Sequence, residues 1–227
     1  MNNTLVIYGS GSSLNNLSNY EKKKLDKMDS VSINLFIKTK IPLKYYILGE
    51  GLSWLLYNYY NTKDIALKNL LKKEYDTYIA ILKTNYKDTK ILFIDNYSSN
   101  MSFLNKYLKI ILSDLKDMEN IQIYNCLNDI SNYNLHKSNE LYHSGCGINC
   151  AINFAIQNKY KNIIFVGIDM YDSKYAYNSI NNKLLNKKAE QIHSTKNSIF
   201  NHISKTKHLI NYFVHNKQSL LTNIIPI

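Results

Sequence analysis

The sequence contains no arginine, so all 28 of its basic residues are lysines; 17 acidic residues leave a formal net charge of +11. A lysine excess of this size attracts phosphates, nucleic acid or an anionic membrane surface. Arginine, however, is the side chain that reads bases and phosphates through paired hydrogen bonds, and its absence argues against a nucleic-acid partner.

Cysteine is also scarce, with three residues at Cys126, Cys146 and Cys150. The first residues have neither the basic nor the apolar region of a signal peptide, so we expect reduced thiols in a cytoplasmic protein. His143 lies close to the last two cysteines, but this spacing matches no common zinc motif. We expect buried apolar cysteines rather than the alternative, a metal cluster.

Long apolar runs and chain breakers are few. No apolar run reaches the ~18 residues of a membrane-spanning helix. With two prolines and no repeat or linker, the 227 residues are expected to form one domain spanning 1–227. The residue patterns predict strands at 4–8, 31–35, 45–48, 77–82, 90–94, 121–125 and 163–166. They predict helices at 14–28, 52–60, 65–71, 101–115, 147–157 and 198–213. This alternation favours an α/β fold with a single Rossmann-like, doubly wound, mostly parallel sheet.

Small and polar residues follow several of these strands. In such sheets ligands bind beyond the carboxyl ends of the strands, so these residues should converge on one cleft. They are Gly9, Ser10, Gly11 and Ser13 in "GSGSS", Asn34 in the second strand, Glu50 and Gly51 after the third, and Gly167 and Asp169 after the strand at 163–166.

Each of these residues also has a purely structural interpretation. "GSGSS" either lets main-chain N–H groups approach an anion or serves as a turn and helix cap. Asn34 stands where a dinucleotide site would have a carboxylate, which favours a nucleotide other than NAD, although a buried structural amide is the alternative. For Asp169 we expect a structural role first, in capping the following backbone and fixing its loop.

Chemistry-bearing side chains follow the strand at 163–166. Tyr171 and Tyr175 are four residues apart, which would bring both phenols to one side of a helix or compact turn. His193, after a polar segment at 178–190, has the pKa range of a general base. The chain has no Asp-x-Asp motif, so a divalent-metal nucleotide-sugar site of that type is not supported.

The segment "SGCGINCAINFAIQNKYKNIIFVGIDMYDSKYAY", followed by "QIHSTKN", resembles the bacterial sialyltransferases of glycosyltransferase family 42, the Campylobacter lipooligosaccharide sialyltransferases. "GSGSSL" and the Asn of "SINLF" fit the same family. The resemblance implies a glycosyltransferase A-type variant of the Rossmann-like fold, with a flexible lid at about 172–193. It also implies metal-independent, inverting transfer of sialic acid from CMP-sialic acid, without a cofactor, to a galactose-terminated glycan of a surface glycolipid.

The resemblance implies roles for individual residues. Ser10 and Asn34 would meet the nucleotide, and Ser144 and Gly145 would lie beside the carboxylate of the donor sugar. Tyr171 and Tyr175 would donate hydrogen bonds to the departing CMP phosphate, and His193 would take the proton of the acceptor hydroxyl. Two aimed phenols can stabilise a leaving phosphate where no metal or arginine is available. The protein would work at the cytoplasmic face of the inner membrane, in peripheral contact with it, and relatives form homo-oligomers.

Several positions depart from the family. Ser10 replaces an Asn, Glu50 and Gly51 replace an Asn-Pro pair, Leu141 replaces an Arg and His143 replaces a Thr. Glu50 adds a carboxylate beside an acidic sugar, and Leu141 removes an arginine there. A lysine or His143 would have to compensate for this change in charge. Two alternatives therefore stay open: another CMP-activated sugar such as Kdo, legionaminic or pseudaminic acid, or a CMP-binding module without transfer activity.

Overall fold

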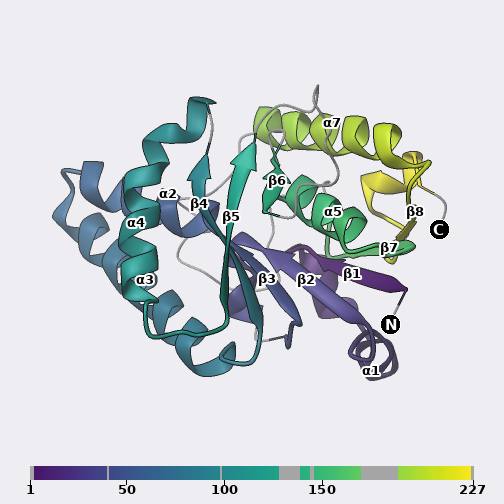
Figure 1. The fold of residues 1–227 in the computed structure, drawn as a ribbon, viewed down its shortest axis with the longest axis horizontal. Coiled ribbons are helices and arrows are strands. Elements are labelled where there is room, and N and C mark those ends of the chain that lie inside the picture. Colours follow the sequence, from purple (N-terminus) through teal and green to yellow (C-terminus); the bar gives the residue numbers. More distant parts are fainter. Residues whose placement is uncertain are drawn as a thin grey trace.

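The computed structural model describes residues 3–39, 41–97, 99–127, 139–143, 146–169 and 189–225. Its strands form one sheet with the order β6-β5-β4-β3-β2-β1-β7-β8, and every neighbouring pair runs parallel (Figure 1). They are β1 (Thr4–Tyr8), β2 (Asp29–Ile33), β3 (Tyr45–Leu48), β4 (Lys90–Tyr97), β5 (Ile121–Leu127), β6 (Glu140–Tyr142), β7 (Asn162–Val166) and β8 (Asn211–Val214). The prediction of an α/β fold with a mostly parallel sheet is confirmed.

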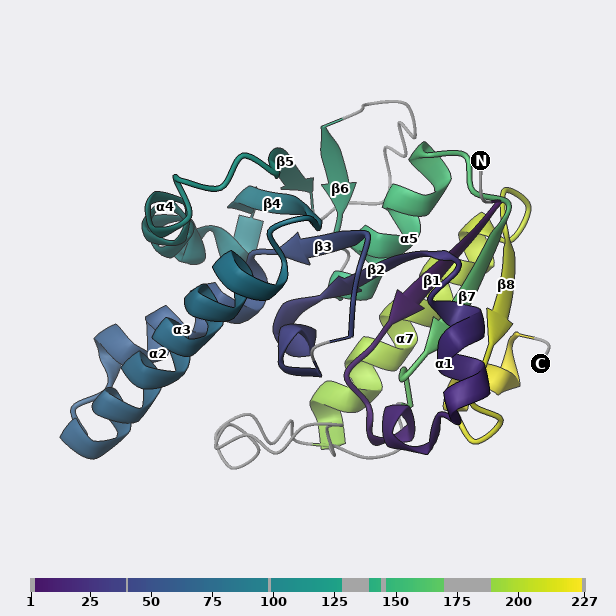
Figure 2. The same ribbon diagram turned by 90° about the horizontal axis from the view of Figure 1, so that it is seen from below.

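Helices connect the strands. The α-helices are α1 (Asn19–Leu25), α2 (Glu50–Asn61), α3 (Ile65–Asn85), α4 (Asn105–Asp114), α5 (Gly147–Gln157) and α7 (Ala189–Thr206). Short 3-10 helices are η1 (Ser12–Asn16), η2 (Asn34–Thr39), η3 (Ser99–Leu104) and η4 (Leu220–Asn223). Two views show α1 on one side of β1 and β2, with α5 and α7 on the other side (Figures 1 and 2).

One predicted strand is wrong. Residues 77–82 ("TYIAIL") belong to α3 and not to a strand. The run is rich in β-branched and aromatic residues, which favours a strand locally. Over the longer window, however, the buried residues recur at helical spacing, and this wider pattern decides the outcome; they are Leu71, Tyr75, Tyr78 and Leu82.

Several predicted boundaries also shift. The second strand ends at Ile33, so Asn34 begins η2 rather than lying inside the strand. The helix expected at 14–28 is divided between η1 and α1, and Ser18 caps α1 with a capping box that includes Glu21. The helix expected at 101–115 is likewise divided between η3 and α4.

The last helix differs most from its prediction. It begins at Ala189 rather than at Ser198 and ends at Thr206, and β8 begins inside the range that was assigned to this helix. Neither β8 nor β6 was predicted, because each is only three or four residues long and pairs at an outer position of the sheet.

The order of the sheet reverses at β1. The chain moves outward from β1 to β6, and α5 then returns it to β7, which pairs with β1 on the side away from β2. In doubly wound sheets a ligand site forms at the carboxyl ends of the strands beside such a reversal. The carboxyl ends of β7, β1, β2 and β3 are consecutive in the sheet, as the predicted cleft requires.

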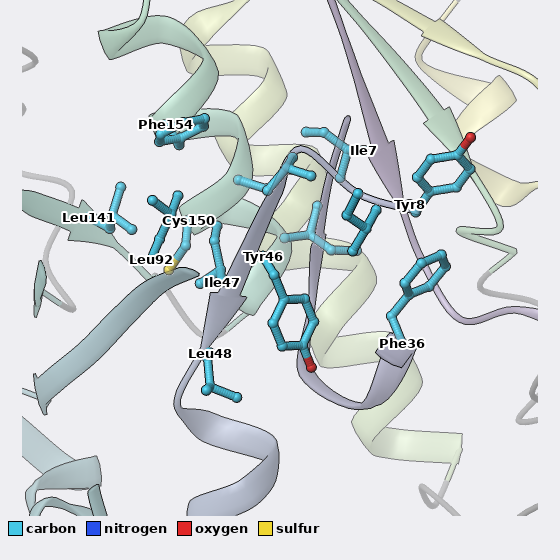
Figure 3. Close-up of a cluster of buried hydrophobic side chains, with 14 of the residues drawn as sticks. Ile7, Tyr8, Phe36, Tyr46, Ile47, Leu48, Leu92, Leu141, Cys150 and Phe154 are labelled. Carbon is cyan, nitrogen blue, oxygen red and sulfur yellow. The ribbon is translucent and has the colours of Figure 1, made fainter. Parts of the chain in front are cut away.

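The core lies between the sheet and its helices. Ile47, Leu92 and Leu141 from the sheet pack beside Cys150 and Phe154 of α5 (Figure 3). All three cysteines are buried and free, as the sequence predicts. Leu141 is fully buried, so the position where the resembling family has an arginine belongs here to the apolar core. Among the described helices, none combines the length and apolar character needed to cross a lipid bilayer.

Candidate functional site

The loops that follow β1 and β7 are bound directly to each other. Gly9 N donates to Val166 O at 2.8 Å, and Gly11 N donates to Gly167 O at 2.8 Å. A Cβ atom at Gly9 would lie 2.4 Å from Gly167 O, and Gly167 itself has a φ of +69°, which favours glycine. These glycines allow two main-chain segments to touch, and the N–H groups of Gly9 and Gly11 are used within the protein.

Asp169 joins this loop pair to a third segment. Its carboxylate accepts from Ser13 N at 2.9 Å, from Ser13 Oγ, and from Asn216 Nδ2 at 2.9 Å. The residue is 3% exposed. This geometry agrees with the expected loop-fixing role, and the described partners come from two segments far apart in the sequence. Ser13 is likewise bound to Asp169 through both its main chain and its hydroxyl.

A second group lies where β3 to β6 end. Nε2 of His143 lies 3.0 Å from Oε2 of Glu50, and the exposed fractions of the two side chains are 4% and 25%. An ionised carboxylate only accepts hydrogen bonds, so His143 carries a proton on Nε2 and donates it to Glu50. Nδ1 of His143 is buried and finds no hydrogen-bond partner among the described residues. Glu50 therefore orients the imidazole, and its negative charge faces a proton donor.

Tyr97, at the end of β4, supports this pair. Its ring meets the His143 ring edge to face, with centroids 6.0 Å apart. Burial first, and then the negative charge of Glu50, hold the pKa of Tyr97 well above its usual value, so this phenol stays protonated. A Cβ at Gly49 would lie 2.9 Å from the Tyr97 hydroxyl oxygen, which explains a glycine directly before Glu50.

The His143 loop is also tied to α7. Asn149 of α5, fully buried, donates from Nδ2 to His143 O at 3.2 Å and to Ser198 Oγ at 2.9 Å. Since α7 connects β7 to the parallel strand β8, it begins at the carboxyl edge of the sheet. His193 is five positions before Ser198, about 7.5 Å along the helix axis at 1.5 Å per residue. Its backbone therefore lies in the half of α7 that starts at the candidate site.

The remaining predicted residues divide into those with a described position and those without. Ser10 is half-buried between β1 and η1, and Gly51 is half-buried in the first turn of α2. Ser144, Gly145, Tyr171 and Tyr175 lie outside the described residues, as does the side chain of His193. Of the lid expected at 172–193, the part up to 188 also lies outside them. Residues 189–193 form the first turn of α7.

The alternative of a metal cluster at His143, Cys146 and Cys150 finds no geometric support in the described part of the chain, where no group of three or more candidate ligands converges. His143 is bound to Glu50, and Sγ of Cys150 lies 3.9 Å from Sγ of Cys126. This sulfur contact first, and then burial, raise the pKa of Cys150, which keeps it a thiol.

Sequence reasoning missed two residues that hold the site together. Tyr97 ends β4, and the rule that led to Glu50 would have found it had the strand been extended beyond residue 94. Asn216, which binds Asp169, follows β8, a strand with no clear sequence signal. No pattern in the sequence indicated it.

With its reversal of strand order at β1 and its candidate site at the carboxyl edge, the structure defines a Rossmann-like, doubly wound α/β protein. It shares this fold with solved structures of the sialyltransferase CstII from Campylobacter jejuni. One, in complex with the substrate analogue cytidine-5'-monophosphate, aligns over 98% of this chain and 83% of its own, with a TM-score of 0.51 at 16% sequence identity. A point variant of Cst-II in complex with CMP aligns over 99% and 85%, with a TM-score of 0.52 at 16% identity. No protein-family model and no curated protein matches the chain.

Proposed function

We propose that this protein is an inverting, metal-independent glycosyltransferase that moves sialic acid from CMP-sialic acid to a galactose-terminated glycan acceptor. The observation that carries the proposal is the fold, which this chain shares over nearly its whole length with a sialyltransferase solved with CMP. The segments expected to meet the nucleotide support it, because the ends of β1, β2 and β7 are neighbours in the sheet.

In the proposed reaction, Ser10 and Asn34 contact the nucleotide, and Ser144 and Gly145 lie beside the carboxylate of the donor sugar. The acceptor oxygen forms a bond to the anomeric carbon while the bond from that carbon to the CMP phosphate breaks. His193 takes the acceptor proton, as a base with a pKa near neutrality can. Tyr171 and Tyr175 donate to the phosphate oxygen that receives the electron pair. A single displacement of this kind inverts the anomeric configuration.

The contact between Glu50 and His143 bears on the donor. A bare carboxylate would repel an acidic sugar, whereas Glu50 accepts a hydrogen bond from His143 at 3.0 Å. This hydrogen bond offsets part of the repulsion between Glu50 and an acidic donor sugar. We therefore propose Glu50, Gly51 and His143 as the part of the site that decides which CMP-activated sugar is bound.

The proposed acceptor is a surface glycolipid precursor at the cytoplasmic face of the bacterial inner membrane. The net charge of +11 favours peripheral contact with anionic lipid. A homo-oligomer fits the resembling family and is part of the proposal. Transfer of Kdo, legionaminic or pseudaminic acid is the second candidate, favoured by Ser10, Glu50 and Leu141.

One assay tests the function. The protein is incubated with a panel of CMP-activated sugars and a fluorescent lactoside in the presence of EDTA, and the product mass is measured. The proposal expects CMP release and a product heavier by one sialic acid residue. If the protein transfers a different sugar, that sugar is the donor and the assignment of sialic acid is wrong. Loss of activity in EDTA contradicts the metal-independent mechanism, and a CMP-induced rise in Tm without any transfer or donor hydrolysis identifies a binding module instead.

A further inference from the structure

Six aromatic side chains form a connected cluster on α2, η3 and α4. Phe103 packs edge to face against Trp54 and Tyr57, with ring centroids 5.4 and 5.3 Å apart. Tyr60 stacks on Tyr107 with centroids 5.8 Å apart. We call this group the aromatic tip: Trp54, Tyr57, Tyr59, Tyr60, Phe103 and Tyr107.

The tip exposes apolar surface. Tyr60 is 54% exposed and Phe103 is 42% exposed, although both are held in place by other rings. Ile65, which begins α3 just after the turn that follows α2, is 76% exposed. Rings fixed in this way lose little conformational freedom when they are buried against a partner. An ordered apolar surface of this kind marks a site of interaction.

Several lysines flank the tip. Nζ of Lys68 lies 5.2 Å from the centroid of the Tyr59 ring, and Nζ of Lys106 lies 4.8 Å from that of Tyr107. Lys63, in the turn between α2 and α3, is exposed. Asp64, the acid in that turn, caps α3 by accepting from Leu67 N at 3.1 Å. Residues 65–73 of α3 and 99–113 of η3 and α4 contain no acid; further along these helices, Asp76 is paired with Lys72 and Asp114 accepts from the Tyr75 hydroxyl.

The exposed rings and the flanking lysines together indicate what binds to the aromatic tip. Tyrosine, tryptophan and phenylalanine rings flanked by lysines are the side chains that settle at the boundary between headgroups and acyl chains of an anionic membrane. A second copy of the chain would bring one set of lysines against another, which is unfavourable. We infer that the aromatic tip is the surface through which this protein docks on a membrane containing anionic lipid.

The fold connects this surface with the candidate site. α2 begins at Glu50 and carries Tyr60 near its end, so the two residues are about 15 Å apart along the helix axis at 1.5 Å per residue. The hairpin of α2 and α3 projects from the sheet at the end opposite α1 (Figures 1 and 2). The docking would hold the site within reach of a lipid-linked glycan. Only this last step rests on the proposed function, because docking itself requires no transfer activity.

The test is sedimentation of the full chain with vesicles of phosphatidylcholine, with or without about one third phosphatidylglycerol. We expect binding to the anionic vesicles, reduced about tenfold by Tyr60→Ser with Phe103→Ser, and reduced similarly by Lys63→Gln with Lys106→Gln. The matched controls lie on α1: Tyr20→Ser, where the ring is 77% exposed, and Lys23→Gln with Lys24→Gln. These controls should bind within about twofold of the native chain.

Circular dichroism and the unfolding midpoint of each variant check that it folds. Equal losses in the tip and α1 variants would overturn the proposal, since they would indicate diffuse attraction by the net charge. A native dimer that dissociates in Tyr60→Ser with Phe103→Ser would identify a contact between copies instead. If vesicles bind through the tip while no CMP-activated sugar is used, the docking inference stands and the proposed function fails. If the protein transfers sialic acid to a soluble lactoside but does not bind vesicles, the proposed function stands and the docking inference fails.

Discussion

His143 donates to Glu50 across a distance of 3.0 Å, although the two residues follow β6 and β3, which are separated by two other strands in the sheet. Neighbouring strands are about 4.8 Å apart, so the side chains of these two residues must reach toward each other across the ends of β5 and β4 to make this contact. Tyr97, at the end of β4, lies against the imidazole ring. The pair thus links loops that the sheet alone would keep apart.

The first prediction concerns the strength of this link. Glu50→Gln and His143→Gln should each destabilise the protein by about 1–2 kcal/mol, and the double variant should lose less than their sum by about 1 kcal/mol, because each single change leaves a buried polar group poorly paired. Urea unfolding of the three variants measures this coupling. The exposed pair Lys72 and Asp76, whose side chains are 49% and 55% exposed, is the control and should show a coupling near zero. Strictly additive losses at Glu50 and His143 would contradict the prediction.

The second prediction concerns Asp169. Asp169→Asn keeps the size of the side chain but replaces one accepting oxygen with an NH₂ group, which faces the donors Ser13 and Asn216. Since hydrogen bonds to a charged group are the strongest in proteins, we expect a loss of about 2–3 kcal/mol in the free energy of unfolding. Asp117→Asn, where the side chain is 73% exposed, should change it by less than about 0.5 kcal/mol. If both variants unfold at the same urea concentration, Asp169 does not hold the loops together.

Sequence patterns predicted the parts of this fold that local periodicity controls. β1, β3 and α5 have the expected bounds, because their apolar residues repeat at the spacing of the element they form. β6 and β8 could not be found in the same way. Both are edge strands, β6 has only three residues, and each exists because a neighbouring strand offers main-chain donors and acceptors.

The candidate site was predictable to the extent that strand ends define it. The convergence of the β1 and β7 loops follows from the rule on carboxyl ends, and Gly9 and Gly167 do meet there. The partners of individual side chains do not follow from any rule of this kind. That Glu50 binds His143, or that Asp169 binds Asn216, depends on how loops distant in sequence fold over the sheet.

The third prediction concerns pH. Burial, together with the positive charge of Lys205, lowers the pKa of His202 in α7 from 6.5 to about 4. In the unfolded chain this histidine takes up a proton near pH 6.5, whereas in the folded protein it does so only near pH 4. The unfolded state therefore binds more protons in this window, and stability must fall as the pH is lowered from 6.5 to 4. The slope is about 1.4 kcal/mol per pH unit, or about 3 kcal/mol in total.

Urea unfolding at several pH values between 7 and about 4.5 measures this slope. His202→Gln should reduce the slope by about 1.4 kcal/mol per pH unit, the contribution of one proton. This reduction does not depend on how the substitution changes the free energy of unfolding at pH 7. His208→Gln, in the exposed turn after α7, is the matched control and should leave the slope unchanged. An unchanged slope in His202→Gln would show that other groups cause the acid sensitivity.

The fourth prediction concerns the proposed reaction. His193→Ala should lower kcat for transfer from CMP-sialic acid by about 10²–10⁴-fold, because the acceptor hydroxyl loses its base. Tyr171→Phe with Tyr175→Phe should lower kcat by about 10²–10³-fold, because the developing charge on the phosphate loses its donors. These variants should still bind CMP, which a rise in Tm with added CMP can show, since the lost interactions belong to the transition state.

The two kinds of variant should also differ from each other. If His193 acts as a base on the acceptor, its removal should slow transfer more than it slows hydrolysis of the donor by water. Removal of the two phenols should slow both reactions equally, because both expel CMP. His208→Gln should leave transfer within about twofold of the native rate, since this exposed histidine lies beyond the opposite end of α7. Full transfer activity in His193→Ala would show that His193 is not the base. If the tyrosine pair affected transfer and hydrolysis unequally, the phenols would act on the acceptor and not on the leaving group.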